Sequence, residues 1–92
     1  MMIDKETFAV FCANVEMVAV DHYDPQTGLL HVWEGNWLLQ RDYWNDLNSM
    51  IPVVEKLIAR SGLIIEFKSG NLPISIRRDF RNFIIDAMEE DE

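Results

Sequence analysis

Cysteine, basic residues and long apolar runs are all scarce in this chain of 92 residues. Its one cysteine, Cys12, cannot form a disulfide within the chain, so the fold does not depend on an oxidising compartment. The uncharged run at residues 7–15 is far shorter than the ~20 residues of a membrane-spanning helix. Residues 1–6 carry two acids before any apolar stretch, unlike a secretory signal. Together these features predict a cytoplasmic protein.

Motifs of enzymes and metal sites are missing as well. The sequence has no Cys-x-x-Cys pair, no Gly-rich phosphate loop, no His-Glu-x-x-His and no Gly-x-Ser-x-Gly. Cys12 lies on an apolar stripe and is expected in the core rather than as a nucleophile. The one cluster that resembles an active or metal site is residues 21–24 with His31, and on a regular strand His22 would point away from His31. We therefore expect no enzyme, no metal and no cofactor; a small hydrolase or metal protein that uses His22 or His31 is an alternative.

The first half of the chain predicts a helix followed by three strands. Asp4 can cap the helix, and apolar residues then recur at helical spacing: Phe8, Phe11, Cys12 and Val15. Strands are predicted at residues 16–23, 29–34 and 37–41, with turns at 24–28 and 35–36.

The second half predicts two more helices. Ser49 is expected to cap the first of them, with Pro52 in its first turn and Gly62 at its end. A short strand is predicted at 63–67, and residues 72–76 could form another. The last helix is expected from about residue 77, with one apolar side: Phe80, Phe83, Ile84, Ala87 and Met88. The order predicts a single α+β domain over residues 1–92, with a three-stranded antiparallel meander, one or two further short strands and three helices.

The spacing of the strands also predicts a register. A loop at 24–28 would place Tyr23 opposite Leu29, Asp21 opposite His31, and Ala19 opposite Trp33. One face would then form the core: Val18, Val20, Leu30 and Val32. The other would carry Met17, Ala19, Tyr23, Leu29, Trp33 and Leu38. Because that second face is too apolar for water, either helices or a second subunit must cover it. Four clustered aromatic residues are candidates for the interface of a homodimer: Trp33, Trp37, Tyr43 and Trp44.

Charge is unevenly distributed along the chain, whose net charge is −8. Residues 1–46 hold eight acids and two bases, net −6; residues 47–88 hold four acids and six bases, net +2; and the last four residues add −4. Residues two apart on a strand or four apart on a helix are separated by about 6 to 7 Å, close to the spacing of phosphates along a DNA strand. Eight carboxylates are candidates for a row that imitates phosphates: Asp21, Asp24, Glu34, Asp42, Asp46, Asp86, Glu89 and Glu90. Alternatively, the acids only keep a small domain soluble.

One basic cluster stands apart from the acids. Arg77, Arg78 and Arg81 lie at the start of the last predicted helix. We expect them to pair within the chain with the acidic tail or the meander; contacts with an acidic partner, a nucleic acid or a second subunit are the alternatives.

Small size, strong acidity and segments such as HVWEGNW at residues 31–37 give the chain a resemblance to a known family. It resembles the DNA-mimic anti-restriction proteins of bacteriophages, most of all the anti-restriction nuclease proteins of the T-even phages. The resemblance implies a dimer in the cytoplasm of the host cell. It also implies that the protein blocks a modification-dependent restriction endonuclease of the McrBC type by occupying its DNA-binding surface. Which carboxylates touch the target is an inference from spacing alone.

Two functional hypotheses follow from these features. The first is an inhibitor that titrates a host DNA-binding protein through patterned carboxylates, without binding nucleic acid or a membrane itself. The second is a binding module, such as an immunity or adaptor protein, whose acidic face neutralises a basic partner. DNA would compete for the partner in the first case and not in the second.

Overall fold

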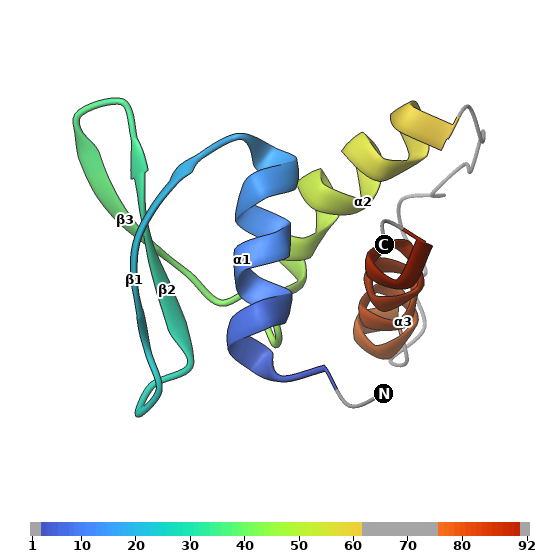
Figure 1. Cartoon of the computed structure of the whole chain (residues 1–92), viewed down its shortest axis with the longest axis horizontal. Helices are drawn as coiled ribbons and strands as arrows, with labels where there is room; N and C mark the ends of the chain where they lie inside the picture. Colours follow the sequence, from blue (N-terminus) through green and yellow to red (C-terminus); the bar gives the residue numbers. More distant parts are fainter. Residues whose placement is uncertain (1–2, 62–75, 91–92) are drawn as a thin grey trace.

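The computed structural model describes residues 3–61 and 76–90, which form three helices and one antiparallel sheet (Figure 1). The helices are α1 (Lys5–Glu16), α2 (Leu47–Ser61) and α3 (Ile76–Glu90), and the strands are β1 (Ala19–Asp24), β2 (Leu29–Glu34) and β3 (Trp37–Arg41). The α+β class and the three-stranded meander are thereby confirmed. The further strands predicted at 63–67 and 72–76, and the helix end predicted at Gly62, lie outside the described residues.

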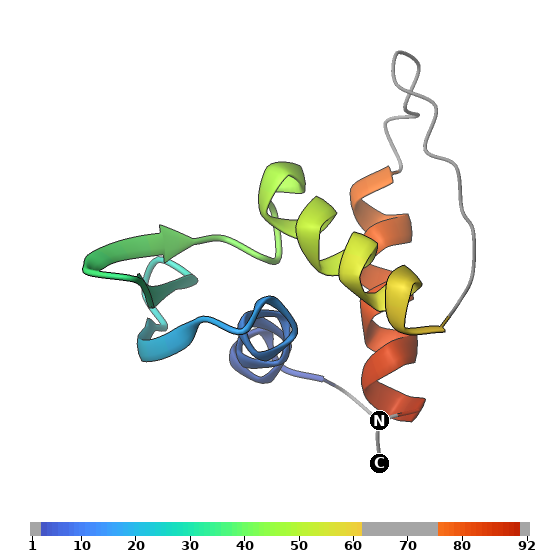
Figure 2. The same ribbon diagram turned by 90° about the horizontal axis from the view of Figure 1, so that it is seen from above.

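The sheet has the strand order β1-β2-β3, and the described helices all lie on one side of it (Figure 2). α1 packs on β1 and β2 and also contacts α2 and α3, so it lies between the sheet and the other two helices. The opposite face of the sheet carries no described helix. The sequence left open whether helices or a second subunit cover the outer face of the sheet. The described helices cover only the inner face.

The core forms where α1 meets β2 and the other two helices. Apolar residues at helical spacing on each helix and at alternate positions of β2 supply it, and their burial is the main force that holds the layers together. The buried side chains include Phe8, Cys12 and Val15 from α1, Leu30 and Val32 from β2, Met50, Val53 and Val54 from α2, and Phe80 and Ile84 from α3.

Both ends of α1 are explained by local sequence. Asp4 has extended backbone angles, and its Oδ1 accepts a hydrogen bond from the backbone N–H of Thr7 at 2.7 Å, as expected for an N-cap. At the other end Met17 adopts the left-handed region, with φ of 63°. Its N–H is directed at the carbonyls of Ala13 and Asn14, which ends the helix and turns the chain into β1.

The start of α2 differs from the prediction. The helix begins at Leu47, and the carboxylate of Asp46 rather than the hydroxyl of Ser49 caps it. Asp46 accepts hydrogen bonds from the N–H of Asn48 at 3.2 Å and from the hydroxyl of Ser49 at 3.1 Å. Pro52 therefore lies inside the helix, beyond its first turn.

The register between β1 and β2 is also different, because β1 contains a bulge between Val20 and His22. Ala19 pairs with Trp33 as predicted, but beyond the bulge the pairs are His22–His31, Tyr23–Leu30 and Asp24–Leu29. Asp21 is the extra residue, and it shifts every later position of β1 to the other face. Tyr23, expected on the outer face, consequently lies opposite buried Leu30 and packs against the core.

Candidate functional site

The open face of the sheet is built around the bulge in β1. His22 pairs with His31, and their rings stack with centroids 4.1 Å apart. The carboxylate of Asp21 pairs with Nδ1 of His22 and accepts a hydrogen bond from Nε1 of Trp33 at 3.2 Å. The two histidines thus share one face, which corrects the expectation that His22 points away from His31. The hydrogen bond with His22, and then the one from Trp33, lowers the pKa of Asp21.

Exposed apolar side chains continue this open face along β2 and β3. Trp33 lies between Ala19 and Leu38 in the sheet, with 41% of its surface exposed, and Leu38 is 45% exposed. Trp37, at the start of β3, pairs with Glu34 and so belongs to the other face of the sheet, where it is 74% exposed. Trp33 and Trp37 are therefore accessible to a partner, as an interface role requires.

The other two aromatic candidates pack against the rest of the domain. Tyr43 is only 1% exposed and belongs to the core, so it is not available to a second subunit. Trp44 packs edge-on against Phe8 with ring centroids 5.1 Å apart, and Lys5 and Arg81 lie over its ring at 5.7 and 5.1 Å. These contacts tie α1 and α3 to the segment before α2, so Trp44 has a role in the single chain. Burial therefore removes Tyr43 from the interface candidates, because exposure cannot be read from residue type, whereas partly exposed Trp44 stays a prediction.

Three of the candidate carboxylates stabilise local turns. Asp24 accepts from the N–H of Gln26 at 2.9 Å, which lowers the pKa of Asp24. Asp42 accepts from the N–H of Asn45 at 3.1 Å, and Asp46 caps α2. Asp42 and Asp46 bracket a turn rather than one side of a helix, so the predicted helical spacing does not apply to this pair. They remain partly or fully exposed.

The three carboxylates on α3 are arranged differently. Asp86, Glu89 and Glu90 are exposed in the last two turns of α3, and Asp86 and Glu90 have the predicted spacing of four residues. Their side chains form no hydrogen bond or ion pair with the rest of the described chain. Glu89 and Glu90 lie in the last turn, at the negative end of the helix dipole, where acidic side chains are destabilising, and Asp86 lies one turn earlier.

The basic cluster does not pair as expected within the part of the chain that is described. Arg77 and Arg78 are exposed at the start of α3 and form no ion pair with a residue in ranges 3–61 and 76–90. Arg81 is half-buried and lies over Trp44 instead. Arg77 and Arg78 thus do not neutralise the described carboxylates of the meander.

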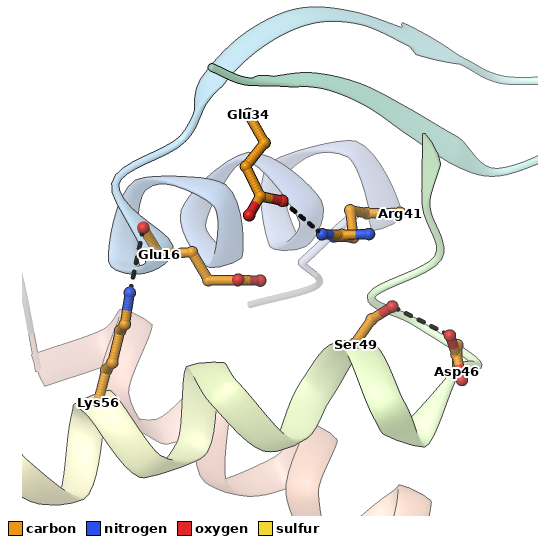
Figure 3. Close-up of polar contacts among 6 residues, drawn as sticks. All are labelled: Glu16, Glu34, Arg41, Asp46, Ser49 and Lys56. Carbon is orange, nitrogen blue, oxygen red and sulfur yellow. Dashed lines mark hydrogen bonds and ion pairs between the residues drawn. The ribbon is translucent and has the colours of Figure 1, made fainter. Parts of the chain in front are cut away.

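A polar cavity lies on the other side of the sheet, between the end of α1, β3 and the start of α2. Its volume is about 210 Å³, and its lining residues are Glu16, Arg41, Asp46, Asn48, Ser49 and Pro52. Figure 3 shows Glu16 and Arg41 pointing into the same space, with Glu34 above them and Lys56 below. No spacing in the sequence indicates this cavity, because its lining residues come from different elements; the one sequence signal is a charged residue, Glu16, at the end of the first helix.

Each cation near this cavity already has a partner. Arg41 donates to Oε2 of Glu34 at 3.1 Å, and the ammonium of Lys56 donates to the backbone carbonyl of Glu16 at 3.1 Å (Figure 3). Oε1 of Glu16 and the hydroxyl of Tyr43 are both buried, and neither has a partner in ideal hydrogen-bond geometry, but the two groups interact with each other. Burial raises the pKa of Tyr43, and the nearby Glu16 carboxylate raises it further.

Within residues 3–61 and 76–90, no three His, Cys, Asp or Glu side chains are placed to hold a metal ion together. No helix in these ranges is both long enough and apolar enough to cross a membrane. Comparison with protein-family models, with curated proteins and with solved structures finds no match to this chain.

Proposed function

We propose that the protein is an acidic DNA mimic that inhibits a host DNA-binding protein by occupying its DNA-binding surface. The observation that carries the proposal is that most of the described carboxylates face solvent without a cation from the described part of the chain. Ion pairs in the described ranges engage only Asp21, with His22, and Glu34, with Arg41. The remaining negative charge is free to meet the lysines and arginines with which proteins bind phosphates.

The placement of acids on α3 supports a role beyond solubility. An acidic residue in the last turn of a helix costs about 0.3 to 1 kcal/mol through the helix dipole. Solubility alone needs no charge at this position, since the same residues elsewhere on the surface would serve equally well. Asp86 and Glu90 rise about 6 Å apart along the helix, near the spacing of successive phosphates.

The target that fits the resemblance is a restriction endonuclease of the McrBC type, and the acting species is a homodimer. The open face of the sheet, with Trp33 and Leu38, is where the second subunit would bind. Dimerisation would bury this apolar face and double the number of carboxylates presented to the target. Sedimentation at high concentration should give twice the 10.8 kDa of one chain, and a species of 10.8 kDa would count against the dimer.

Competition with DNA tests the proposed function. The tagged full chain is used to capture partners from bacterial lysate, with and without excess duplex DNA. We expect DNA to displace a specific partner, and we expect binding of that partner to weaken steeply as salt increases. The double variant Asp86→Asn, Glu90→Gln should bind less, whereas Glu6→Gln with Glu55→Gln removes the same charge from other exposed positions and should bind nearly as the wild type does.

Two results would contradict DNA mimicry. Affinity that does not change between low and high ionic strength would exclude an electrostatic interface of this kind. A partner that DNA does not displace would instead indicate the alternative function, an immunity or adaptor protein that neutralises a basic protein away from its DNA site.

A further inference from the structure

The bulge in β1 brings the two histidines of the chain together on the open face of the sheet. His22 pairs with His31 across the strands, and the stacked rings have centroids 4.1 Å apart with 12° between their planes. In a strand without the bulge, His22 would lie on the face that packs against the helices. The expectation that these residues bind no metal assumed that they point apart, and the bulge removes that argument. Bulges often re-aim a side chain at a functional site.

Asp21 prepares His22 to act as a metal ligand. Its carboxylate contacts Nδ1 of His22, and the pKa of Asp21 is lowered, so this carboxylate can only accept at neutral pH. In the neutral ring, Nδ1 therefore carries the proton and Nε2 keeps its lone pair. Histidines that bind metals through one ring nitrogen usually donate the other N–H to a carboxylate or a carbonyl, which fixes the ring. The side chain of His22 is 55% exposed, so an ion from solvent can reach it.

One chain supplies only part of the ligand set. Within residues 3–61 and 76–90, no third His, Cys, Asp or Glu is placed to complete a metal site with the two histidines. A tetrahedral ion holds two imidazole nitrogens about 3.3 Å apart, less than the 4.1 Å between the stacked rings, so small rotations of the two side chains would bring both onto one ion. A second copy on the same face would supply the other two ligands, because a two-fold interface places residues near its axis against their own counterparts.

The charge of this face favours a dication. Each copy carries a net charge of −8, and the carboxylates of Asp21 and Asp24 lie near the two imidazoles. No ion pair in the described ranges joins either carboxylate to a lysine or an arginine. Two copies that approach through this face would repel each other, and a bound dication would reduce that repulsion. Imidazole ligands select zinc, copper or nickel rather than magnesium or calcium.

We propose that His22 and His31 from each of two copies hold one zinc ion between their open faces. Four imidazoles around one ion match the coordination number that zinc prefers in structural sites. The bridging arrangement rests on the homodimer of the proposed function, whereas it needs neither DNA mimicry nor a particular target. Cys12 does not compete for the ion, because it is fully buried and burial raises the pKa of its thiol.

A zinc titration of the untagged full chain tests this site. The chain is first treated with a chelator, and zinc chloride is then added while NMR follows the histidine ring protons and sedimentation gives the mass. Because the chain has two histidines, their ring signals report this site alone. We expect both histidines to shift until one ion is present for two chains, and we expect zinc to strengthen dimerisation roughly tenfold or more.

Matched variants assign the effect to the histidine pair. His22→Asn and His31→Asn should each abolish the effect of zinc on dimerisation. Asp21→Asn should weaken zinc binding roughly tenfold, because His22 loses the carboxylate that orients it. Asp24→Asn removes the same charge from the same region but keeps an oxygen that can accept from Gln26, so it should weaken zinc binding less than about threefold. If a histidine variant fails to fold, the ring signals of the wild-type chain still decide the question.

Three results would overturn the proposal: ring signals that do not respond to zinc, saturation at one ion per chain without dimerisation, or a dimer equally strong in chelator and in zinc. Failure of the zinc site and failure of the proposed function are distinguishable. DNA-sensitive capture of a partner by a chain that ignores zinc would refute the zinc site alone. A zinc-linked dimer without DNA-sensitive capture would refute DNA mimicry alone.

Discussion

Met17 is held in a backbone conformation that its side chain does not favour. It ends α1 with φ of 63°, and 86% of its surface is exposed, so little packing compensates for this geometry. The left-handed region costs a residue with a Cβ roughly 1 to 2 kcal/mol, and glycine avoids that cost but loses more entropy on folding. We expect Met17→Gly to raise the free energy of unfolding by about 0.5 to 1 kcal/mol in urea denaturation.

A second substitution separates backbone from side-chain effects at this position. Met17→Ala removes the same exposed side chain but keeps a Cβ, so its stability should stay within about 0.5 kcal/mol of the wild type. A gain in Met17→Ala as large as that in Met17→Gly would show that the methionine side chain, rather than the left-handed conformation, is the source of instability.

At the scale of elements, α1 depends on its N-cap, and this makes one part of its stability sensitive to pH. The hydrogen bond from the N–H of Thr7 lowers the pKa of Asp4 below its usual 3.8. A folded-state pKa below the unfolded value means that this contribution is present above about pH 3.8 and is lost as pH falls through the lowered pKa. The amide proton shift of Thr7, followed by NMR during an acid titration, should therefore change with a midpoint below 3.8.

Two variants of Asp4 serve as controls for the cap. Asp4→Asn keeps a side-chain oxygen that can accept from Thr7, and Asp4→Ala does not. At neutral pH we expect the melting temperature of Asp4→Ala to be the lower of the two, and the acid-dependent shift of Thr7 to disappear in Asp4→Asn. Persistence of that shift in Asp4→Asn would assign the titration to another carboxylate.

The elements that were predicted correctly are those determined by nearby residues. The cap at Asp4 and the helical spacing from Phe8 to Val15 involve contacts within one turn or one side of a helix, and they identify α1. The meander follows in the same way from turn residues such as Gly28, which has φ of 75°. Local patterns of this kind need no knowledge of the rest of the chain.

The errors arose where distant residues decide between local alternatives. Asp21 is the bulge residue, and its carboxylate contacts both His22 and Trp33, which is twelve residues away in the sequence. A prediction from strict alternation ignores this bulge and therefore placed the later residues of β1 on the wrong faces of the sheet. Asp46 and Ser49 are both good caps, and the preceding turn places Asp46 at the helix start. The cavity beside Glu16 joins residues from α1, β3 and α2, and no spacing in the sequence indicates it.

At the scale of the whole molecule, negative charge is concentrated in residues 1–46, net −6, and in the last four residues, net −4, while residues 47–88 carry a net +2. Repulsion among like charges destabilises the compact state of such a protein, and salt screens it. If the acids serve to bind a target, then some of them should lie at positions where they lower the free energy of unfolding. The acids at the negative end of α3 are the clearest case, because no described cation pairs with them.

The double variant Asp86→Asn, Glu90→Gln should therefore be more stable than the wild type and yet a weaker inhibitor. Removing Glu90 from the last turn, together with its like-charged neighbour Asp86 four residues earlier, should raise the free energy of unfolding by about 0.5 to 1.5 kcal/mol at low salt, and less at high salt. Glu55→Gln, in the middle of α2, should change stability by less than about 0.5 kcal/mol. Urea denaturation at two salt concentrations measures the first effect, and capture of the DNA-displaced partner measures the second. If the double variant gains stability and binds its partner undiminished, the carboxylates of α3 take no part in imitating phosphates, and the acidic interface must be sought on the meander.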